Sequence, residues 1–288
     1  MHRAEIVVGV SGSAASTAAV RWAAAGASLR KARLRLLVAH QRQTSEVWLR
    51  SRGELLRSPG RQAAEVLDAA VREARSVAPD VDVSGAAVPG EPVPVLLDAA
   101  EGADLMVVGG RGRGRLGQLL GTVTSQVATY APCSVAVVRE RQEPAGDVVV
   151  LGIDESPSAA AAAALAFAEA ALRRSSRLLA VTAYPESPPV LAAGPLPSPA
   201  DAQAEEARLR QDVAEQLAPW RDKHPGVTVH SEVVGGEAGA VLADRSRPAQ
   251  LVVVGAGSCP GFEGLRLGSV VLHLLHHADC PVLIARPR

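Results

Sequence analysis

Residues 103–112, ADLMVVGGRG, have a counterpart at 249–258, AQLVVVGAGS. In each copy an apolar run ends in glycine, which indicates a strand opening into a loop. Two more pairs recur in the same order: EIVVGVSGS at 5–13 with VVVLGIDES at 148–156, and YAPCSVAVVR at 130–139 with HADCPVLIAR at 277–286. Three ordered matches predict a duplicated domain, with halves at 1–140 and 147–288 joined by a charged segment that contains Pro and Gly.

Within each half, short apolar runs alternate with helical patterns. The expected strands are 6–10, 34–39, 81–86, 105–108 and 135–138, then 148–153, 178–183, 227–233, 251–254 and 282–285. Helices are expected near 15–30, 61–77, 92–101 and 117–129. Strands alternating with helices are typical of parallel sheets covered on both faces. The predicted fold class is therefore α/β: two tandem doubly wound domains, each a five-stranded parallel sheet with helices on both faces.

Composition and charge exclude several classes of protein. The 288 residues carry 30 basic and 30 acidic side chains, so the basic excess of a nucleic-acid binder is missing. No apolar run approaches the roughly 20 residues of a membrane span, and the first residues do not form a signal peptide. Cys133, Cys259 and Cys280 are too few and too scattered for a disulfide framework or a metal cage. We expect a cytoplasmic protein without membrane or nucleic-acid partners.

Two further patterns concern metals and association. His273, His276 and His277 have helical spacing, but no carboxylate or Cys cluster completes a metal site, so packing is favoured. The last strand of each half, 134–138 and 281–285, lacks the charges that protect a sheet edge. We therefore expect these strands to pair and form an intrachain pseudo-dimer, while a homodimer of chains remains open.

The stretch GGRGRGRLGQLLGT at 109–122 follows a strand and precedes a helix. Gly109 and Gly255 both end strands, at the edge where open α/β sheets bind ligands. Thr122 and Ser269 lie near a helix start, where backbone N–H groups and a hydroxyl can face an anion. The spacing fits neither GxGxxG nor GxxxxGK[ST]. A glycine-rich turn without a ligand is the alternative, and RNA binding is weaker because aromatic residues are missing from the stretch.

Over nearly all of its length the chain resembles a tandem universal stress protein. Nucleotide-binding members of that family carry Gly, two residues, Gly, nine residues, then Gly and Ser or Thr, with an Asp just after the first strand. In the first half only eight residues precede Gly121, and Ser11 stands at the Asp position. In the second half Asp154 and the nine-residue spacing are present, but Ser258 replaces the middle glycine. The second half is expected to hold the more complete pocket.

The resemblance implies ATP as the ligand, with ADP, AMP and accompanying Mg²⁺ left open. The implied nucleotide-binding residues are Ala39 and Ala183 near adenine, Ser11 and Asp154 near ribose, and Gly109, Arg111, Gly112, Gly121, Thr122, Thr124, Gly255, Gly257, Ser258, Gly268 and Ser269 near the phosphates. The implied role is that of a stress-response or dormancy regulator. Nucleotide binding would switch its conformation or its association with an unidentified protein partner, with little or no hydrolysis of the nucleotide. No catalytic residue is identified, because a Walker lysine and a general base are missing. A nucleotide-free scaffold and a slow ATPase are the alternatives.

Overall fold

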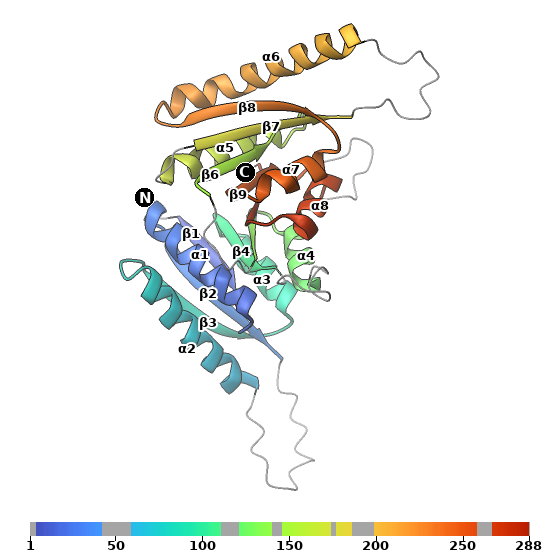
Figure 1. The fold of residues 1–288 in the computed structure, drawn as a ribbon. Helices are drawn as coiled ribbons and strands as arrows, with labels where there is room; N and C mark the ends of the chain where they lie inside the picture. Colours follow the sequence, from blue (N-terminus) through green and yellow to red (C-terminus); the bar gives the residue numbers. More distant parts are fainter. Residues whose placement is uncertain are drawn as a thin grey trace. The chain divides into compact units, whose positions relative to one another are not determined.

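The computed structural model describes residues 4–41, 59–110, 121–139, 146–173, 177–185, 199–257 and 267–287. The chain divides into two compact units, residues 1–140 and 141–288 (Figure 1). Each unit is an α/β domain with one parallel sheet, so the fold class predicted from the sequence is confirmed. No helix in the described part of the chain is long and apolar enough to span a bilayer.

In the first unit all strand pairs are parallel, and the strand order is β3-β2-β1-β4-β5. Its elements are β1 (Glu5–Gly9), α1 (Ala14–Arg30), β2 (Arg33–His40), α2 (Pro59–Val77), β3 (Val83–Pro89), α3 (Pro92–Ala100), β4 (Leu105–Gly109), α4 (Thr122–Tyr130) and β5 (Ser134–Val138). Helices α1 and α2 pack together on one face of the sheet, and α3 and α4 pack on the other. The order reverses between β1 and β4, which is the switch point where such sheets bind ligands.

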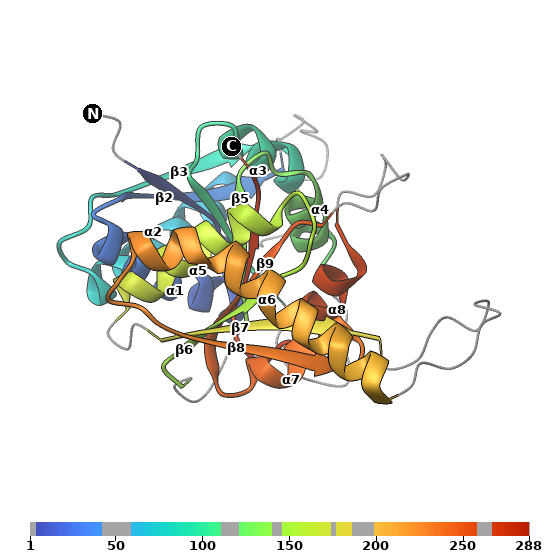
Figure 2. The ribbon, with the colours of Figure 1, turned by 90° about the horizontal axis from the view of Figure 1, so that it is seen from above.

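The second unit repeats this plan with the order β8-β7-β6-β9-β10. Its elements are β6 (Val148–Gly152), α5 (Ala159–Leu172), β7 (Arg177–Tyr184), α6 (Pro199–Lys223), β8 (Thr228–Gly235), α7 (Ala238–Ser246), β9 (Ala249–Gly255), α8 (Ser269–His277) and β10 (Val282–Ala285). Helix α6 packs along β8, and α7 packs against α8 (Figure 2). The switch point here lies between β6 and β9.

Small side chains bring the first helix of each unit close to its sheet. Ala19, Ala23 and Ala27 of α1 are fully buried, and ten of the 14 residues of α5 are alanine. Ser13 caps α1, its hydroxyl accepting a hydrogen bond of 3.2 Å from the backbone N–H of Ser16. Such a cap satisfies one of the N–H groups that a helix start leaves unpaired. The loop between β1 and α1 is thereby fixed at the carboxyl end of the sheet.

The outer strands β3 and β8 differ from the expected ranges. The sequence predicted 81–86 and 227–233, whereas the strands span Val83–Pro89 and Thr228–Gly235. Each outer strand ends where its inner neighbour ends. Strand β2 pairs with β3 up to His40 and Pro89, and β7 pairs with β8 up to Tyr184 and Gly235. No residue of either strand is fully buried, so their sequences lack the continuous apolar run that marks the central strands.

Candidate functional site

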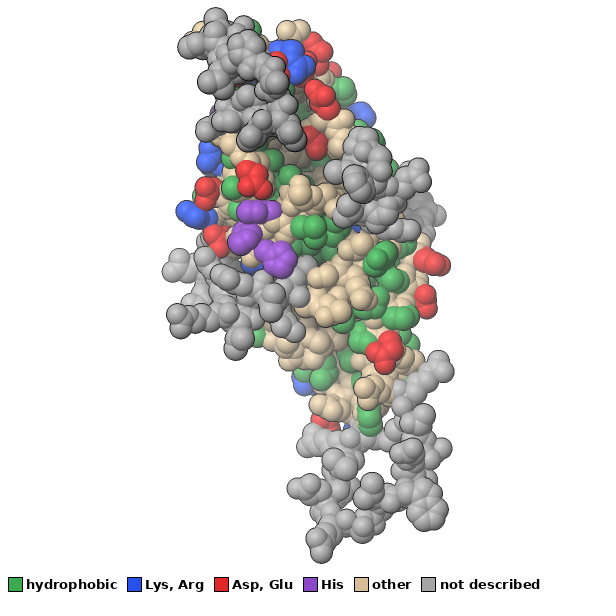
Figure 3. Space-filling view, turned by 90° about the vertical axis from the view of Figure 1, so that its right-hand side faces the viewer, with side chains coloured by type: hydrophobic (Ala, Val, Ile, Leu, Met, Phe, Trp, Pro, Cys, Tyr) green, Lys and Arg blue, Asp and Glu red, His purple; other side chains and the backbone are tan. Residues whose placement is uncertain are grey.

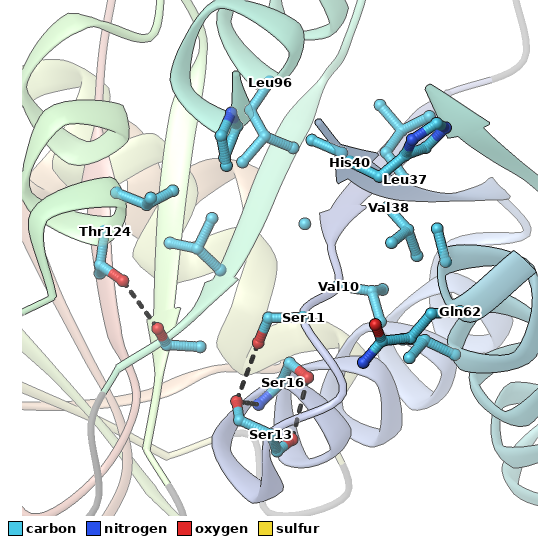
Figure 4. Close-up of a pocket in the computed structure, with 18 of the residues that line it drawn as sticks. Val10, Ser11, Ser13, Ser16, Leu37, Val38, His40, Gln62, Leu96 and Thr124 are labelled. Carbon is cyan, nitrogen blue, oxygen red and sulfur yellow. Dashed lines mark hydrogen bonds between the residues drawn. The ribbon is translucent and has the colours of Figure 1, made fainter. Parts of the chain in front are cut away.

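A cavity of about 480 Å³ opens at the carboxyl ends of β2, β1 and β4 in the first unit. Strand β2 contributes Ala39, the loop after β1 contributes Ser11, and β4 ends beneath it at Gly109. Figure 4 shows Ser11 in the middle, Gln62 on the α2 side and Thr124 on the α4 side. The structure therefore brings these four predicted residues, Ser11, Ala39, Gly109 and Thr124, to one cavity.

A network of serine hydroxyls forms the polar edge of this cavity. The hydroxyl oxygens of Ser11 and Ser13 lie 3.0 Å apart, and the Ser16 hydroxyl donates to the Ser13 carbonyl at 2.9 Å. Both Ser11 and Ser13 are exposed. Gly12 between them has a φ of +76°, a conformation that favours glycine and turns the chain sharply into α1. These hydroxyls thus face the cavity on a rigid turn.

The second unit has a smaller cavity of about 230 Å³ at the carboxyl ends of β7, β6 and β9. Six predicted residues line it: Asp154, Ala183, Gly255, Gly257, Gly268 and Ser269. The Asp154 carboxylate accepts a hydrogen bond of 3.0 Å from the backbone N–H of Ser156. One carboxylate oxygen is used in this turn, and the other can accept from a ligand.

Close packing explains why β4 and β9 both end in glycine. A side chain at Gly109 would place its Cβ 2.7–2.9 Å from backbone atoms of Ala15 and Ser16 at the start of α1. At Gly255 the obstacle is Ser158, whose Cβ would lie 2.8 Å away. These glycines are required by the helix beneath them, whether or not a ligand is bound. The sequence motif alone could not separate this structural requirement from ligand binding.

The helices that follow β4 and β9 begin at the cavities without a side-chain cap. Gly121 and Gly268 occupy the N-cap positions, and no described side chain bonds to either helix start. Unpaired N–H groups at a helix start attract anions, and the helix dipole adds to this. Both glycines have extended backbones, with φ of −65° and −69°. Any residue can adopt these conformations, so the positions can be substituted without backbone strain.

The predicted hydroxyl residues at these helix starts have different surroundings. Thr124 is buried, and its hydroxyl donates to the Gly109 carbonyl at 2.8 Å, tying α4 to the end of β4. Ser269 lines the second cavity, whereas Gly121 and Thr122 start α4 beside the first without being among the residues that line it. Arg111, Gly112 and Ser258 lie outside the described residues.

Several lining residues were missed by the sequence reasoning. Gln62 and His40 reach the first cavity from α2 and from the end of β2. Leu96 and Leu242 occupy equivalent places in α3 and α7, beneath Gly9 and Gly152. The repeat VLL at 95–97 and VLA at 241–243 was available as a signal for the leucines, but no local pattern marks Gln62. No described residue lining either cavity is Lys or Arg.

Histidines gather on α8, where Figure 3 shows a group of them at the surface. The rings of His273 and His277 have centroids 4.4 Å apart, and those of His276 and His277 lie 6.3 Å apart. Among the described residues, no group of three or more His, Cys, Asp or Glu side chains is placed to hold a metal ion. His273 also packs against Gly239 of α7, where an added Cβ would meet it at 2.8 Å.

Comparison with known proteins decides the family. The family model described as "Universal stress protein family" matches residues 3–139 of this chain and matches again at residues 147–286. The chain belongs to the universal stress protein family. A universal stress protein of Mycobacterium tuberculosis H37Rv is 34% identical over 296 residues, covering 98% of this chain and 96% of its own. One from Mycolicibacterium smegmatis is 35% identical over 297 residues, covering 98% and 97%.

The same fold is found in solved structures whose sequence identity to this chain is lower. The crystal structure of a universal stress protein from Archaeoglobus fulgidus aligns with a TM-score of 0.70 at 16% identity, covering 98% of both chains. The resemblance inferred from the repeated motifs is therefore confirmed at the level of family and fold. This universal stress protein contains two family domains in one chain.

Proposed function

We propose that each half of this universal stress protein binds an adenine nucleotide across the carboxyl ends of three strands. The observation that carries the proposal is the order of groups along each cavity: Ala39 at β2, Ser11 after β1 and Gly109 at β4. Neighbouring strands lie about 4.8 Å apart, so the three ends span roughly 10 Å. A base, a sugar and a phosphate group laid in that order would meet an apolar strand end, a polar turn and a helix start.

The base end offers an unpaired backbone edge. The Leu37 carbonyl accepts from Val10 on the β1 side, and the His40 carbonyl accepts from Gly90 on the β3 side. Because the direction of backbone groups alternates along a strand, Ala39 turns its N–H and C=O to the β1 side, beyond the end of β1 at Gly9. These groups can pair with the donor and acceptor edge of adenine.

The second half repeats this arrangement. Ile153 donates to the Val181 carbonyl, and Gly236 donates to the Tyr184 carbonyl. By the same alternation, Ala183 faces the β6 side beyond Gly152. The base would then be read by backbone groups in both halves, which fits the survival of these positions as alanine in two otherwise divergent copies.

The phosphate end is a helix start in each half. The N-termini of α4 and α8 are uncapped by any described side chain, and anions bind well at such positions. The described walls contribute no Lys or Arg, and their ionisable side chains, His40 and Asp154, stand at the base and ribose positions rather than at the phosphate end, so slow hydrolysis at most is expected. We propose ATP as the physiological ligand, acting by shifting a conformational or partner equilibrium during stress.

The test uses a charge placed at one helix start at a time. Gly268→Glu puts a carboxylate beside the phosphates of the second site, and Gly121→Glu does the same in the first. Glutamate is favourable at a helix start, so folding should be retained. We expect ATP affinity at the altered site to fall on the order of a hundredfold, measured by isothermal titration calorimetry of the full chain.

Alanine at the same positions is the matched control. At Gly268 an added Cβ meets its nearest neighbours at 3.6 and 3.8 Å, which is ordinary contact. Gly268→Ala should therefore bind ATP nearly as the unaltered chain does, and so should Gly121→Ala, whose φ of −65° any residue can adopt. Unchanged affinity in both glutamate variants, or no ATP binding by the unaltered chain, would contradict the proposal and favour a nucleotide-free scaffold.

A further inference from the structure

The two halves present opposite hydrogen-bonding groups at one position. Ser11 and Asp154 each stand two residues beyond the last glycine of the central strand, Gly9 or Gly152. The residue between the glycine and this position is held in the same way in both halves. The Val10 N–H donates to the Leu37 carbonyl of β2 at 2.8 Å, and the Ile153 N–H donates to the Val181 carbonyl of β7 at 3.1 Å. The two side chains therefore start from the same point of the fold.

This position faces the middle of each cavity. It follows β1 or β6, which lie between the strand proposed to meet the base and the strand whose end meets the phosphates. A nucleotide bound as proposed places the 2′ and 3′ oxygens of its ribose near Ser11 in one half and near Asp154 in the other. The inference below rests on that proposed function.

The hydroxyl pair of the first half has a hydrogen to donate. Ser11 and Ser13 are 3.0 Å apart, and the Ser13 oxygen also accepts from the backbone N–H of Ser16. One hydroxyl hydrogen is used between the two side chains, whichever donates, and the other remains for a ligand. The amide of Gln62 lines the same cavity and adds further donors. No described residue lining this cavity is Asp or Glu.

The carboxylate of the second half can only accept. One oxygen of Asp154 is bonded to the Ser156 N–H, and the Ser156 hydroxyl pairs with the buried Ser158. Glu155 follows directly, where the first half has Gly12. A ribose hydroxyl can donate to Asp154, whereas a phosphate on that oxygen would bring two negative groups together. The cavity is also about half as large, 230 Å³ against 480 Å³.

We infer that the first-half cavity accepts adenine nucleotides that carry a phosphate on the 2′ or 3′ oxygen of ribose, and that the second-half cavity takes only nucleotides with free ribose hydroxyls. A phosphate ester is an acceptor, and the Ser11–Ser13 pair supplies the donor that matches it. In dinucleotide-binding folds a carboxylate likewise binds the free ribose 2′-hydroxyl, whereas an Arg accommodates a 2′-phosphate. The duplicated protein thereby senses two nucleotide classes in one chain.

The experiment compares AMP with adenosine 3′,5′-bisphosphate and its 2′,5′ isomer, which differ from AMP by a single phosphate. Full-length Gly268→Glu leaves the first site for measurement, and Gly121→Glu leaves the second. Calorimetry should show at least one bisphosphate binding the first site as tightly as AMP or more tightly. At the second site both bisphosphates should bind on the order of tenfold or more weakly than AMP.

Reciprocal substitutions test whether this one side chain decides the preference. Ser11→Asp in the Gly268→Glu chain should impose the penalty on bisphosphates, and Asp154→Ser in the Gly121→Glu chain should relieve it. Both positions are exposed and neither has a positive φ, so folding is not at risk. If AMP binds both sites and both sites reject the bisphosphates equally, the inference is overturned while the proposed function stands. If AMP and the bisphosphates bind neither site, both are overturned.

Discussion

The first half of the chain and the second share a backbone frame but differ in the side chains that line it. Both end their central strands in glycine, tie the next residue to the neighbouring strand and start an uncapped helix at a glycine. They differ at Ser11 against Asp154, and at Thr124 against Val271. Close packing therefore accounts for the backbone features that the two copies share, whereas the side chains that face the cavities differ between them.

The largest effect is expected when a side chain is added to the glycine that ends β4 or β9. These substitutions test whether the two halves are packed alike. Gly109→Ala should lower the free energy of unfolding of the first half by about 3 kcal/mol, because the new Cβ meets backbone atoms of Ala15 and Ser16 that cannot move aside. Gly255→Ala should be destabilising too, but its obstacle is mainly the Ser158 side chain. Urea denaturation followed by circular dichroism measures both.

A second substitution separates the clash with backbone atoms in the first half from the clash with a side chain in the second. Ser158→Gly removes the side chain that Gly255→Ala meets, so the double variant should regain much of the lost stability, and glycine is tolerated at an N-cap. Ala15→Gly should not rescue Gly109→Ala, since the clashing atoms are backbone. Gly102→Ala and Gly226→Ala, where an added Cβ meets nothing within 4 Å, are the controls. Equal rescue in both halves would show that the two frames are packed alike.

A smaller effect is expected where Thr124 ties α4 to β4. Thr124→Val removes the 2.8 Å hydrogen bond to the Gly109 carbonyl and should cost about 1 kcal/mol of stability. Val271 is the counterpart in α8 and is 2% exposed. If the frames are equivalent, the hydroxyl of Val271→Thr should reach the Gly255 carbonyl, with a change in stability below about 1 kcal/mol. A loss above about 2 kcal/mol, as expected for an unpaired buried hydroxyl, would argue against equivalence.

Much of the fold followed from the sequence because the central strands are buried on both faces. Runs such as 105–108 and 251–254 are apolar throughout, and each ends at a glycine. The ends of the edge strands were placed one to three residues off, because none of their residues is fully buried and the apolar signal is weak. Strand length at an edge depends on the neighbouring strand, which a local pattern does not contain.

The candidate site was predictable in part for a similar reason. Ser11 and Asp154 stand at fixed distances from a strand end, so the repeat aligns them without a structure. Gln62 reaches the cavity from α2 across a long connection, and only the packed helix reveals it. The Thr124 hydroxyl was expected to face phosphate, but its donor role toward the Gly109 carbonyl depends on how α4 meets β4. Tertiary contacts of this kind leave no mark in local spacing.

The central claim is that each half holds its own adenine nucleotide site. Native mass spectrometry of the full chain, titrated with ATP, counts the bound nucleotides directly. The account predicts two per unaltered chain, one in Gly121→Glu, one in Gly268→Glu and none when both substitutions are combined. A count of one or none in the unaltered chain, or two in either single variant, would contradict it.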